Sequence, residues 1–589
     1  MLAHLSELIA AAKGERPCDL LLRGGYVLNV FLRQFQRCDL AVHRGMVVGL
    51  GERPAREIVD VEGLYLVPGF MDGHVHLESS MLTPEYYAQA VVPRGTTGVV
   101  ADPHEFANVC GLEGVRYLQR ARSRVPLELF IGVPSCVPAT PLEDAGAALE
   151  AEDIASLRGG EGIVGLGEMM NYPGLLAGEE SVLAKLGALG NEAHIDGHAP
   201  SLSGPELQAY VLAGISTDHE CTTLAEAREK LALGMRIMLR QGSLARNLET
   251  LAPLVTESVL ERCLLVTDDR EPEDLLREGH LDYLIELAIK SGIRAEAAFM
   301  LASWNVAQAF QLPRLGALTP GYWANICALS KKGQEWSEGF KVLKVWQRGR
   351  LVAAQGQYLY PLEEAPRGAL EGNSIHLAPD WRGHLTLSVP TAGEYRVRVI
   401  GLEEGSLLTE AREATLKAQA DGQGGWQVAA DPERDILKLA AYERHKASGK
   451  VGLGFLQGLK FKGGALASTV AHDSHNLVVV GDNDKDMELA VETLAHCGGG
   501  LTFVQAGQVK ATLPLPIAGL VSPQPLEKVY EFLSNLYAQV RQAGCPFDHP
   551  FMALAFMTLP VIPHLKLSDR GLVDVDRFQI VGSPILGPA

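Results

Sequence analysis

The 589-residue sequence has no long apolar run, no paired cysteines and no excess of positive charge. No stretch approaches the ~18 apolar residues that would span a bilayer. The amino-terminal stretch MLAHLSELIAAAKGERPCDL has neither the apolar core nor the small-residue cleavage site of a signal peptide. We therefore expect a cytoplasmic protein that does not act on a membrane.

The charge balance is acidic, with 52 Lys and Arg against 71 Asp and Glu and a formal net charge of −19. Because no basic cluster offsets this charge, a nucleic-acid backbone or an anionic membrane is disfavoured as the main partner. The nine cysteines are odd in number and far apart, without a C-x-x-C pair, which indicates a reducing compartment and no zinc–thiolate site. A small molecule is the partner that we expect.

The chain is long enough for two or three cores, and its texture changes twice along its length. Residues 1–68 and 315–363 both carry short β-type runs, which predict one composite antiparallel β-sandwich built from both sides of an inserted domain. Residues 364–589 combine strands such as NLVVVGD with helices such as LEKVYEFLSNLYAQVRQ, which predicts an α+β carboxyl-terminal domain.

The inserted region, residues 69–314, alternates short apolar runs with helical stretches. Eight parallel strands that alternate with helices form a (β/α)8 barrel, in which the chemistry lies at the carboxyl ends of the strands. The eight expected strands lie in MDGHVHL, TTGVVADP, LELFIGVPS, GIVGLGE, EAHIDGH, GISTDH, RIMLR and CLLVTDD.

The first of these runs contains two histidines, His74 and His76, in GFMDGHVHLESSM. Residues i and i+2 of a strand point to the same face, so both imidazoles can bind one metal ion. An H-x-H pair alone is weak evidence, because a strand end can carry two polar side chains for other reasons. The later strands must therefore supply further ligands.

Four further ligand-type residues stand at the ends of the fourth, fifth, sixth and eighth expected strands: Glu168, His198, His219 and Asp268. A histidine pair, a bridging carboxylate, two single histidines and an aspartate would support two metal ions that share a hydroxide. A carboxylate in the apolar surroundings of GLGEMM is costly unless it is paired or bound to metal. The sequence therefore predicts an α/β fold with a metal-dependent (β/α)8 barrel, in which these residues bind the metal ions.

Three of these positions leave alternatives open. His194 competes with His198, although it could be a hydrogen-bonded core residue nearer the middle of its apolar segment. His219 could instead neighbour the N-cap of the helix at CTTLAEAREK. Asp268 and Asp269 are adjacent, and because strand neighbours face opposite ways at most one of them should meet the metals. Asp268 is our choice.

Seven stretches together resemble the adenine deaminase family of the amidohydrolase superfamily: PGFMDGHVHLESS, ADPHEFANV, GEMMNYPG, IDGHAP, STDHE, VTDDR and GGALASTVAHDSHNLVVVGD. The resemblance covers most of the chain, and GHVHLESS with AHDSHN distinguishes this family from amidohydrolases at large. It implies hydrolysis of adenine to hypoxanthine and ammonia, as in purine salvage, at a binuclear centre of manganese or iron, with zinc also compatible. The family's ligands carry over to His74, His76, Glu168, His198, His219 and Asp268.

Two positions compare differently with the wider superfamily. Many amidohydrolases bridge their metals with a carboxylated lysine, where this chain has Glu168, as adenine deaminases do. Asn325 replaces the Asp of the common G-x-x-A-D run, in a segment expected in the outer sheet. This second departure leaves the chemistry of the barrel unaffected.

Such a reaction needs an acid and a base as well as the metal. Asp268 can accept the proton of the attacking water and return it to the departing amine. The proton for the ring nitrogen needs a separate acid, for which Glu78 and His104, with Glu105 beside it, are the candidates. The alternative for these side chains is a supporting or helix-capping role.

We predict substrate-binding residues at the carboxyl ends of the barrel strands and in the carboxyl-terminal domain. Ser79 and Asp269 are possible readers of the purine edges. The stretch KGGALASTVAHDSHN carries His472 and His475, which we expect to bind substrate from a loop that covers the barrel mouth. The alternative is a polar turn at a domain interface.

Two rival functions remain possible. An amidohydrolase that acts on a cyclic amide or N-acyl substrate would use the same metals, but such enzymes do not resemble this chain beyond the barrel and sheet. A non-catalytic purine-binding relative would tend to lose ligands, whereas all six ligand-type residues are present. We expect a homo-oligomer, dimer or tetramer, with adenine and water as its small-molecule partners.

Overall fold

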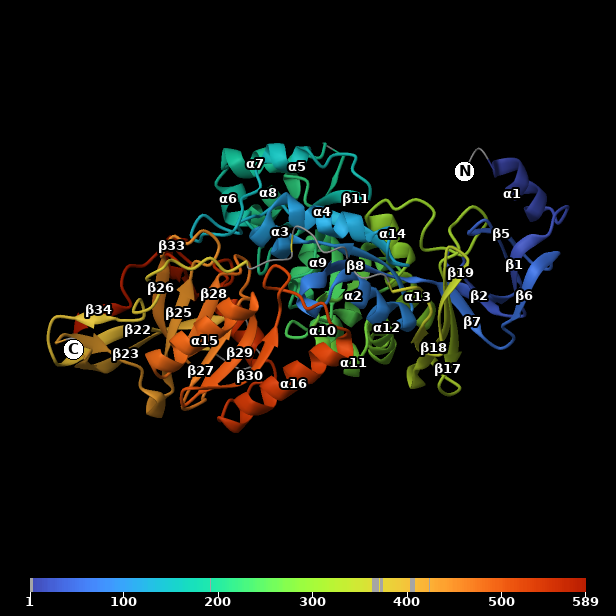
Figure 1. Cartoon of the computed structure of the whole chain (residues 1–589). Coiled ribbons are helices and arrows are strands. Elements are labelled where there is room, and N and C mark those ends of the chain that lie inside the picture. Colours follow the sequence, from blue (N-terminus) through green and yellow to red (C-terminus); the bar gives the residue numbers. More distant parts are fainter. Residues whose placement is uncertain (1–3, 191, 363–369, 371–373, 403–407, 423) are drawn as a thin grey trace.

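The computed structural model describes the chain except for residues 1–3, 191, 363–369, 371–373, 403–407 and 423. Three regions follow one another along an elongated α/β molecule (Figure 1). The amino-terminal sheets lie at one end, the carboxyl-terminal domain lies at the other, and alternating strands and helices lie between them. The expected boundary at residues 363–364 lies outside the described residues.

Two sheets form the amino-terminal end, where helix α1 (Leu5–Ala12) covers one of them. The first sheet, in the order β5-β4-β1-β6, comprises β5 (Met46–Leu50), β4 (Leu40–His43), β1 (Cys18–Arg23) and β6 (Ala55–Asp60). The second comprises β20 (Gln357–Tyr358), β19 (Arg350–Ala354), β18 (Phe340–Gln347), β17 (Ile326–Lys331), β7 (Tyr65–Pro68), β2 (Tyr26–Asn29) and β3 (Gln34–Arg37).

The second sheet joins segments that are far apart in the chain, because β17 pairs antiparallel with β7 and sets Ile326 opposite Pro68. A buried apolar core that includes Leu66, Ile326 and Trp346 lies beneath this contact. The expected purely antiparallel pairing is wrong for two pairs, since β1 with β6 and β2 with β7 run parallel. Longer connections replace hairpins at these two places, and a parallel pair requires such a crossover.

Each of the eight expected runs of the central region contains strand, and every pairing between these strands is parallel. One sheet has the order β12-β11-β10-β9-β8-β16, with β12 (His194–Gly197), β11 (Ile163–Met169), β10 (Glu128–Val133), β9 (Thr96–Ala101), β8 (Phe70–His76) and β16 (Asp268–Asp269). The other has the order β13-β14-β15, with β13 (Thr217–Asp218), β14 (Arg236–Arg240) and β15 (Cys263–Val266).

The eighth expected run is divided at Thr267. Its first part, β15, pairs with β14, whereas its second part, β16, pairs with β8 and sets Asp268 opposite Val75. All seven residues of β8 are buried, as expected of a parallel strand covered on both faces. The division brings Asp268 beside the strand that carries His74 and His76.

Helices alternate with these strands and cover them (Figure 1). The run DLLREGHLDYLIELAIKSG forms two helices, because Gly279 has φ +120° between them, outside the helical region. The helices are α2 (Pro84–Val91), α3 (His104–Cys110), α4 (Leu112–Ala121), α5 (Ala151–Ala155), α6 (Tyr172–Leu176), α7 (Glu180–Leu186), α8 (Gly204–Leu212), α9 (Leu224–Ala232), α10 (Leu248–Leu251), α11 (Pro272–Arg277), α12 (Leu281–Lys290), α13 (Ala295–Leu301) and α14 (Trp304–Ala309).

The carboxyl-terminal domain is built on a large mixed sheet. Its strands are β21 (Ser388–Val389), β24 (Trp426–Val428), β23 (Thr409–Ala420), β22 (Glu394–Leu402), β26 (Val451–Gln457), β25 (Ile436–Tyr442), β28 (Leu477–Gly481), β27 (Ala465–Ser468), β29 (Gly500–Gln505) and β30 (Gln508–Pro514), with β34 (Ile585–Pro588) paired to β22. A smaller sheet contains β31 (Leu565–Ser568), β32 (Gly571–Asp574) and β33 (Gln579–Ile580).

Helices α15 (Asp484–Cys497), α16 (Leu526–Gln542) and α17 (Pro550–Ala555) complete this domain. Asn483 caps α15 by accepting the backbone N–H of Asp486, and Gly498 ends it in the left-handed conformation. Met487, Ala490 and Leu494 of α15 are buried in an apolar cluster with residues of the sheet. In the described parts of the chain, no helix has the length and apolar character needed to cross a bilayer.

Glu271, at the start of α11, links the central region to the carboxyl-terminal domain. Its buried carboxylate accepts hydrogen bonds from the hydroxyl of Tyr537 on α16, at 3.0 and 2.8 Å, and from Nδ1 of His549, at 2.6 Å. Burial alone would lower the pKa of His549, but the charge and hydrogen bond of Glu271 raise it to about 9. The domains are therefore joined by a buried ion pair close to Asp268 in the chain.

Replacing His549 with Gln should lower the free energy of unfolding by up to about 3 kcal/mol near pH 6, because a raised pKa in the folded state stabilises it while the proton is bound. The difference should be full below the ordinary pKa near 6.5 and disappear as the pH rises through about 9. Urea unfolding at several pH values measures it. His564→Gln, which removes an exposed pair with Asp576, is the control. A pH-independent difference would contradict the assigned ion pair.

Candidate functional site

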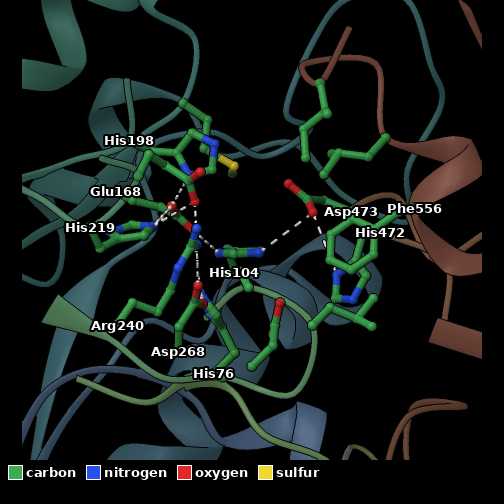
Figure 2. A pocket seen from close by; sticks show the side chains of 18 of the residues that line it. His76, His104, Glu168, His198, His219, Arg240, Asp268, His472, Asp473 and Phe556 are labelled. Carbon is green, nitrogen blue, oxygen red and sulfur yellow. Dashed lines mark hydrogen bonds and ion pairs between the residues drawn. The ribbon is translucent and has the colours of Figure 1, made fainter. Parts of the chain in front are cut away.

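A cavity lies at the carboxyl ends of the central strands. Figure 2 shows that the central region supplies one side of the cavity and the carboxyl-terminal domain the other. The lining includes His76, His104, Glu105, Glu168, His198, His219, Glu220, Arg240, Asp268, Asp269, His472, Asp473, Met552, Phe556, Leu559 and Ile562.

His74 and His76 end β8, and each ring is oriented by an acceptor. Nδ1 of His74 lies 2.7 Å from the Asp196 carboxylate, and Nδ1 of His76 lies 3.1 Å from the carbonyl oxygen of Asp102. If each Nδ1–H donates to its acceptor, the two Nε2 atoms present lone pairs to one another at 3.0 Å. Such an arrangement repels unless a cation or a proton lies between, so the donor set fits a metal ion.

Glu168, near the end of β11, lies between two groups of imidazoles. Its Oε1 is 3.3 Å from Nε2 of His76, whereas Oε2 is 2.6 Å from Nδ1 of His198 and 3.2 Å from Nε2 of His219. Burial would raise the pKa of Glu168, but the neighbouring histidines hold it well below the usual range. Its two oxygens therefore face different ligand sets, as a carboxylate that bridges two cations requires.

Asp268 completes the cluster from β16. Its Oδ1 is 3.2 Å from Nε2 of His76, and its Oδ2 accepts from Arg240 at 2.6 Å. Its φ of +59° is uncommon for a residue other than glycine, and such strain concentrates at functional sites. Asp269 instead accepts from the Ser79 hydroxyl at 2.5 Å. The neighbouring aspartates therefore have different partners.

Two charged residues that sequence reasoning missed, Arg240 and Glu220, lie beside this cluster. The buried Arg240 guanidinium pairs with both Glu220 and Asp268. Burial would raise the pKa of Glu220, but Arg240 and the nearby histidines lower it to about 2. Arg240 is the last residue of β14, so its place at the carboxyl end of the seventh expected strand was the available signal.

The acid candidates occupy different places. His104 lines the cavity, with Nδ1 3.5 Å from Glu168 and Nε2 3.7 Å from Asp473. Glu78 accepts the backbone N–H of Phe106 in the first turn of α3, at 3.1 Å, and burial raises its pKa to about 7. Glu78 is not among the described side chains that line the cavity.

The expected substrate contacts are also divided. His472 lines the cavity, with Nδ1 3.2 Å from Glu105 and its ring stacked on Phe556 at 4.7 Å between centroids. His475 is fully buried, and its Nδ1 accepts the backbone N–H of Ala471. Neither His475 nor Ser79 is among the described lining residues, although Ser79 contacts the lining carboxylate of Asp269.

His194, the alternative to His198, lies at the other end of β12. Its ring is near Ser216, at 3.2 Å, and packs against Phe310, 4.3 Å away between centroids. Burial lowers its pKa to about 4. The structure thus brings His198, rather than His194, next to Glu168.

Lys230 on α9 fixes the loops that carry two of the clustered histidines. Its fully buried ammonium donates to the carbonyl of Ala199 at 2.7 Å, to Asp218 at 2.9 Å and to Glu226 at 2.9 Å. Ala199 follows His198 and Asp218 precedes His219 in the chain. One buried cation therefore sets the ends of two neighbouring strands.

Family models match two parts of the chain: residues 65–352 match the Amidohydrolase family, and residues 406–579 match the Adenine deaminase C-terminal domain. Adenine deaminase 2 of Carboxydothermus hydrogenoformans is 45% identical over 582 residues, which cover 98% of this chain and 99% of that protein. Adenine deaminase of Nitratidesulfovibrio vulgaris (strain DP4) is 44% identical over 582 residues, with 98% of each chain covered.

Solved structures are less similar. A crystal structure of an adenine deaminase has 18% identity and a TM-score of 0.44, covering 57% of this chain and 99% of its own. The dihydropyrimidinase of Brevibacillus agri NCHU1002 has 18% identity and a TM-score of 0.45, covering 58% and 96%.

Removing the Lys230 ammonium should be strongly destabilising. Lys230→Met leaves Asp218 buried without its counter-charge, which costs about 3–5 kcal/mol. Chemical unfolding of the intact chain measures the loss. Lys290→Met provides the control, because its exposed contact with Glu286, at 3.7 Å, should contribute less than about 1 kcal/mol. Equal losses in the two variants would contradict this role.

Proposed function

Because the chain belongs to the adenine deaminase family of amidohydrolases, we propose that it hydrolyses adenine to hypoxanthine and ammonia at a binuclear metal centre. The observation that carries the metal assignment is Glu168, whose two oxygens face separate histidine groups. We propose that this activity serves purine salvage. All nine cysteines lie among the described residues and none forms a disulfide, which fits the reducing cytoplasm that we propose as its location.

We also propose that the two parallel sheets form one closed (β/α)8 barrel within a three-domain chain: residues 1–68 with 315–363, 69–314, and 364–589. Two contacts support closure: the backbone N–H of Ser216 donates to the carbonyl of Ile195 between β12 and β13, at 3.2 Å, and β15 continues into β16 beside β8. The neighbouring exposed side chains of Phe31 and Leu32 support a homo-oligomer, dimer or tetramer.

The ligand groups assign places for two ions. His74, His76 and Glu168 would hold one, and Glu168, His198 and His219 the other, with Asp268 beside the first. In the second group, Nδ1 of His198 and Nε2 of His219 both face Oε2 of Glu168. Imidazole and carboxylate ligands suit manganese or iron, and also zinc. Bound there, the ions would lower the pKa of water from about 16 to about 7, so hydroxide is present at neutral pH.

Three side chains would move or position protons. The Asp268 carboxylate accepts the proton of the attacking water and delivers it to the departing amine. His104, which lines the cavity close to Glu168, is placed to give a proton to the ring nitrogen. Arg240 holds Asp268 by one oxygen and leaves the other directed at His76. Apolar side chains of the carboxyl-terminal domain, including Met552 and Phe556, exclude water from the opposite side.

Metal content and substrate range test the proposal together. Protein purified without oxygen should contain two divalent ions per chain and release ammonia from adenine, but should not open hydantoin or dihydroorotate. Glu168→Gln should lose both ions, because the bridge loses its charge. Glu113→Gln, which alters an exposed pair with Arg116, should keep both. Metal-loaded protein that binds adenine without making hypoxanthine would overturn the catalytic assignment and favour the purine-binding alternative.

The proton-transfer role of Asp268 predicts a sharp loss in one variant. Asp268→Asn should lower kcat about 10²- to 10⁴-fold, because the amide cannot accept the proton, while the fold and metal content remain. Steady-state assay, metal analysis and thermal unfolding measure the three quantities. Asp269→Asn is the matched neighbour, and its contact with Ser79 predicts a change in KM rather than kcat. Turnover retained in Asp268→Asn would rule out the proton shuttle.

A further inference from the structure

The wall of the cavity opposite His198 and Glu168 comes from the carboxyl-terminal domain (Figure 2). Phe556, Met552, Leu559 and Ile562 make much of this wall apolar. Among the described residues that this domain contributes to the lining, Asp473 is the sole carboxylate. A charged group in an apolar wall is costly, so its place there needs a reason.

One carboxylate oxygen of Asp473 receives no hydrogen bond from the described residues. The side chain is buried, its Oδ1 lies 3.7 Å from both His104 and His472, and its Oδ2 has no hydrogen-bond partner among the described residues. Burial would raise the pKa of Asp473, but the charge of His104 lowers it. The group is therefore an ionised acceptor, and an ionised carboxylate accepts hydrogen bonds without donating.

The other carboxylates of the cavity are engaged. Glu220 pairs with Arg240, and Asp269 accepts from Ser79. Glu105 lies between Ser79, at 3.3 Å, and His472, at 3.2 Å. Glu168 and Asp268 face the ligand histidines, as described above. Among the described carboxylates that line the cavity, Asp473 is thus the one with a fully buried oxygen that has no hydrogen-bond partner, and it lies on the side away from the clustered ligands.

The position of Asp473 is held by its own domain. The hydroxyl of Thr558 donates to the carbonyl of the preceding residue, His472, at 3.2 Å. Lys566 donates to the carbonyl of Phe556, on which the His472 ring stacks. These contacts fix the Asp473 side of the wall before any ligand enters, which lowers the entropic cost of binding.

The chemistry of a purine explains why an acceptor belongs here. The amino-bearing carbon must lie toward Glu168 and Asp268, so the five-membered ring points toward the opposite wall. A free purine base carries an N–H on that ring, whereas a purine substituted at N9, such as a nucleoside, lacks it. An unpartnered carboxylate discriminates strongly against a ligand that leaves it unsatisfied.

We propose that Asp473 accepts the N–H of the five-membered ring of a free purine base, and that this contact selects free bases over N9-substituted purines. This inference rests on the proposed function. It assigns a specificity-determining residue to the carboxyl-terminal domain, which contributes a recognition group as well as a cover.

Two variants and three ligands test this assignment. In Asp473→Ala, kcat/KM for adenine should fall about 10- to 100-fold, mainly through KM, because one charge-assisted hydrogen bond is lost. The kcat/KM for 9-methyladenine should stay unchanged. The selectivity ratio, which is kcat/KM for adenine divided by kcat/KM for 9-methyladenine, therefore falls by the same factor. Asp473→Asn keeps an acceptor oxygen and should fall between. In the native chain, 7-methyladenine also lacks an N–H on the five-membered ring, so it should be rejected as 9-methyladenine is.

Asp144→Asn is the control for an indirect effect in which the contact between the two domains is merely loosened. Asp144 pairs with Arg570 at 2.7 Å and with Lys450 at 2.6 Å across the same domain boundary, but it does not line the cavity. This variant should keep the selectivity ratio. If it loses the ratio as Asp473→Ala does, or if Asp473→Ala weakens both substrates equally, Asp473 is structural and the inference is wrong.

Equilibrium binding separates this inference from the proposed function. Titration calorimetry with adenine and 9-methyladenine is done in the Asp268→Asn background, which turns adenine over too slowly to consume it, and the preference for adenine should again disappear when Asp473→Ala is added. Absence of ammonia release with a binding preference that depends on Asp473 would overturn the proposed reaction alone. Ammonia release with a preference independent of Asp473 would overturn this inference alone.

Discussion

One buried carboxylate, that of Glu168, sets the electrostatic requirements of the rest of the site. An anion with almost no access to water must be surrounded by cations or donors. Histidines from three other strand ends converge on the Glu168 carboxylate. The backbone N–H of Glu168 donates to the carboxylate of Asp102. The His76 ring is held in turn by the carbonyl of Asp102, and the neighbouring His74 ring by the carboxylate of Asp196. The parallel strands supply the convergence, because their carboxyl ends meet at one edge.

Further buried charges beside the site are arranged around this requirement. Lys230 ties together the two loops that carry His198 and His219, and Arg240 occupies the space between Glu220 and Asp268. None of these groups is exposed, so each depends on its partners for compensation. The site is thus a closed set of opposite charges in which no single member can be removed without cost.

Much of this arrangement is predictable from the sequence, for a physical reason. Short apolar runs ending in His, Glu or Asp predict both a parallel strand and a polar residue at its active edge, and the positions of Glu168 and Asp268 follow directly. Contacts between distant segments are different. The pairing of Arg240 with Asp268, and the approach of Asp473 to His104, depend on how strands and domains come together rather than on local pattern.

The local sequence pattern also failed to predict places where the backbone changes direction. The eighth strand divides at Thr267, and this change does not alter the apolar periodicity enough to be read. Ser79 and Glu78 follow the ligand pair so closely that direct contact with a substrate was the natural reading. In the structure a short turn at Leu77–Ser80 directs them to α3 and Asp269 instead.

The link from Glu271 to Tyr537 and His549 connects the carboxyl-terminal domain to the segment that carries Asp268 and Asp269. The same domain supplies the wall that contains Asp473. A domain attached at both places cannot evolve as an independent module, because exchanging it for the corresponding part of a relative changes the binding wall and the support of the Asp268 segment at once. Compensating changes in such exchanges are therefore expected around α11 as well as in the binding wall.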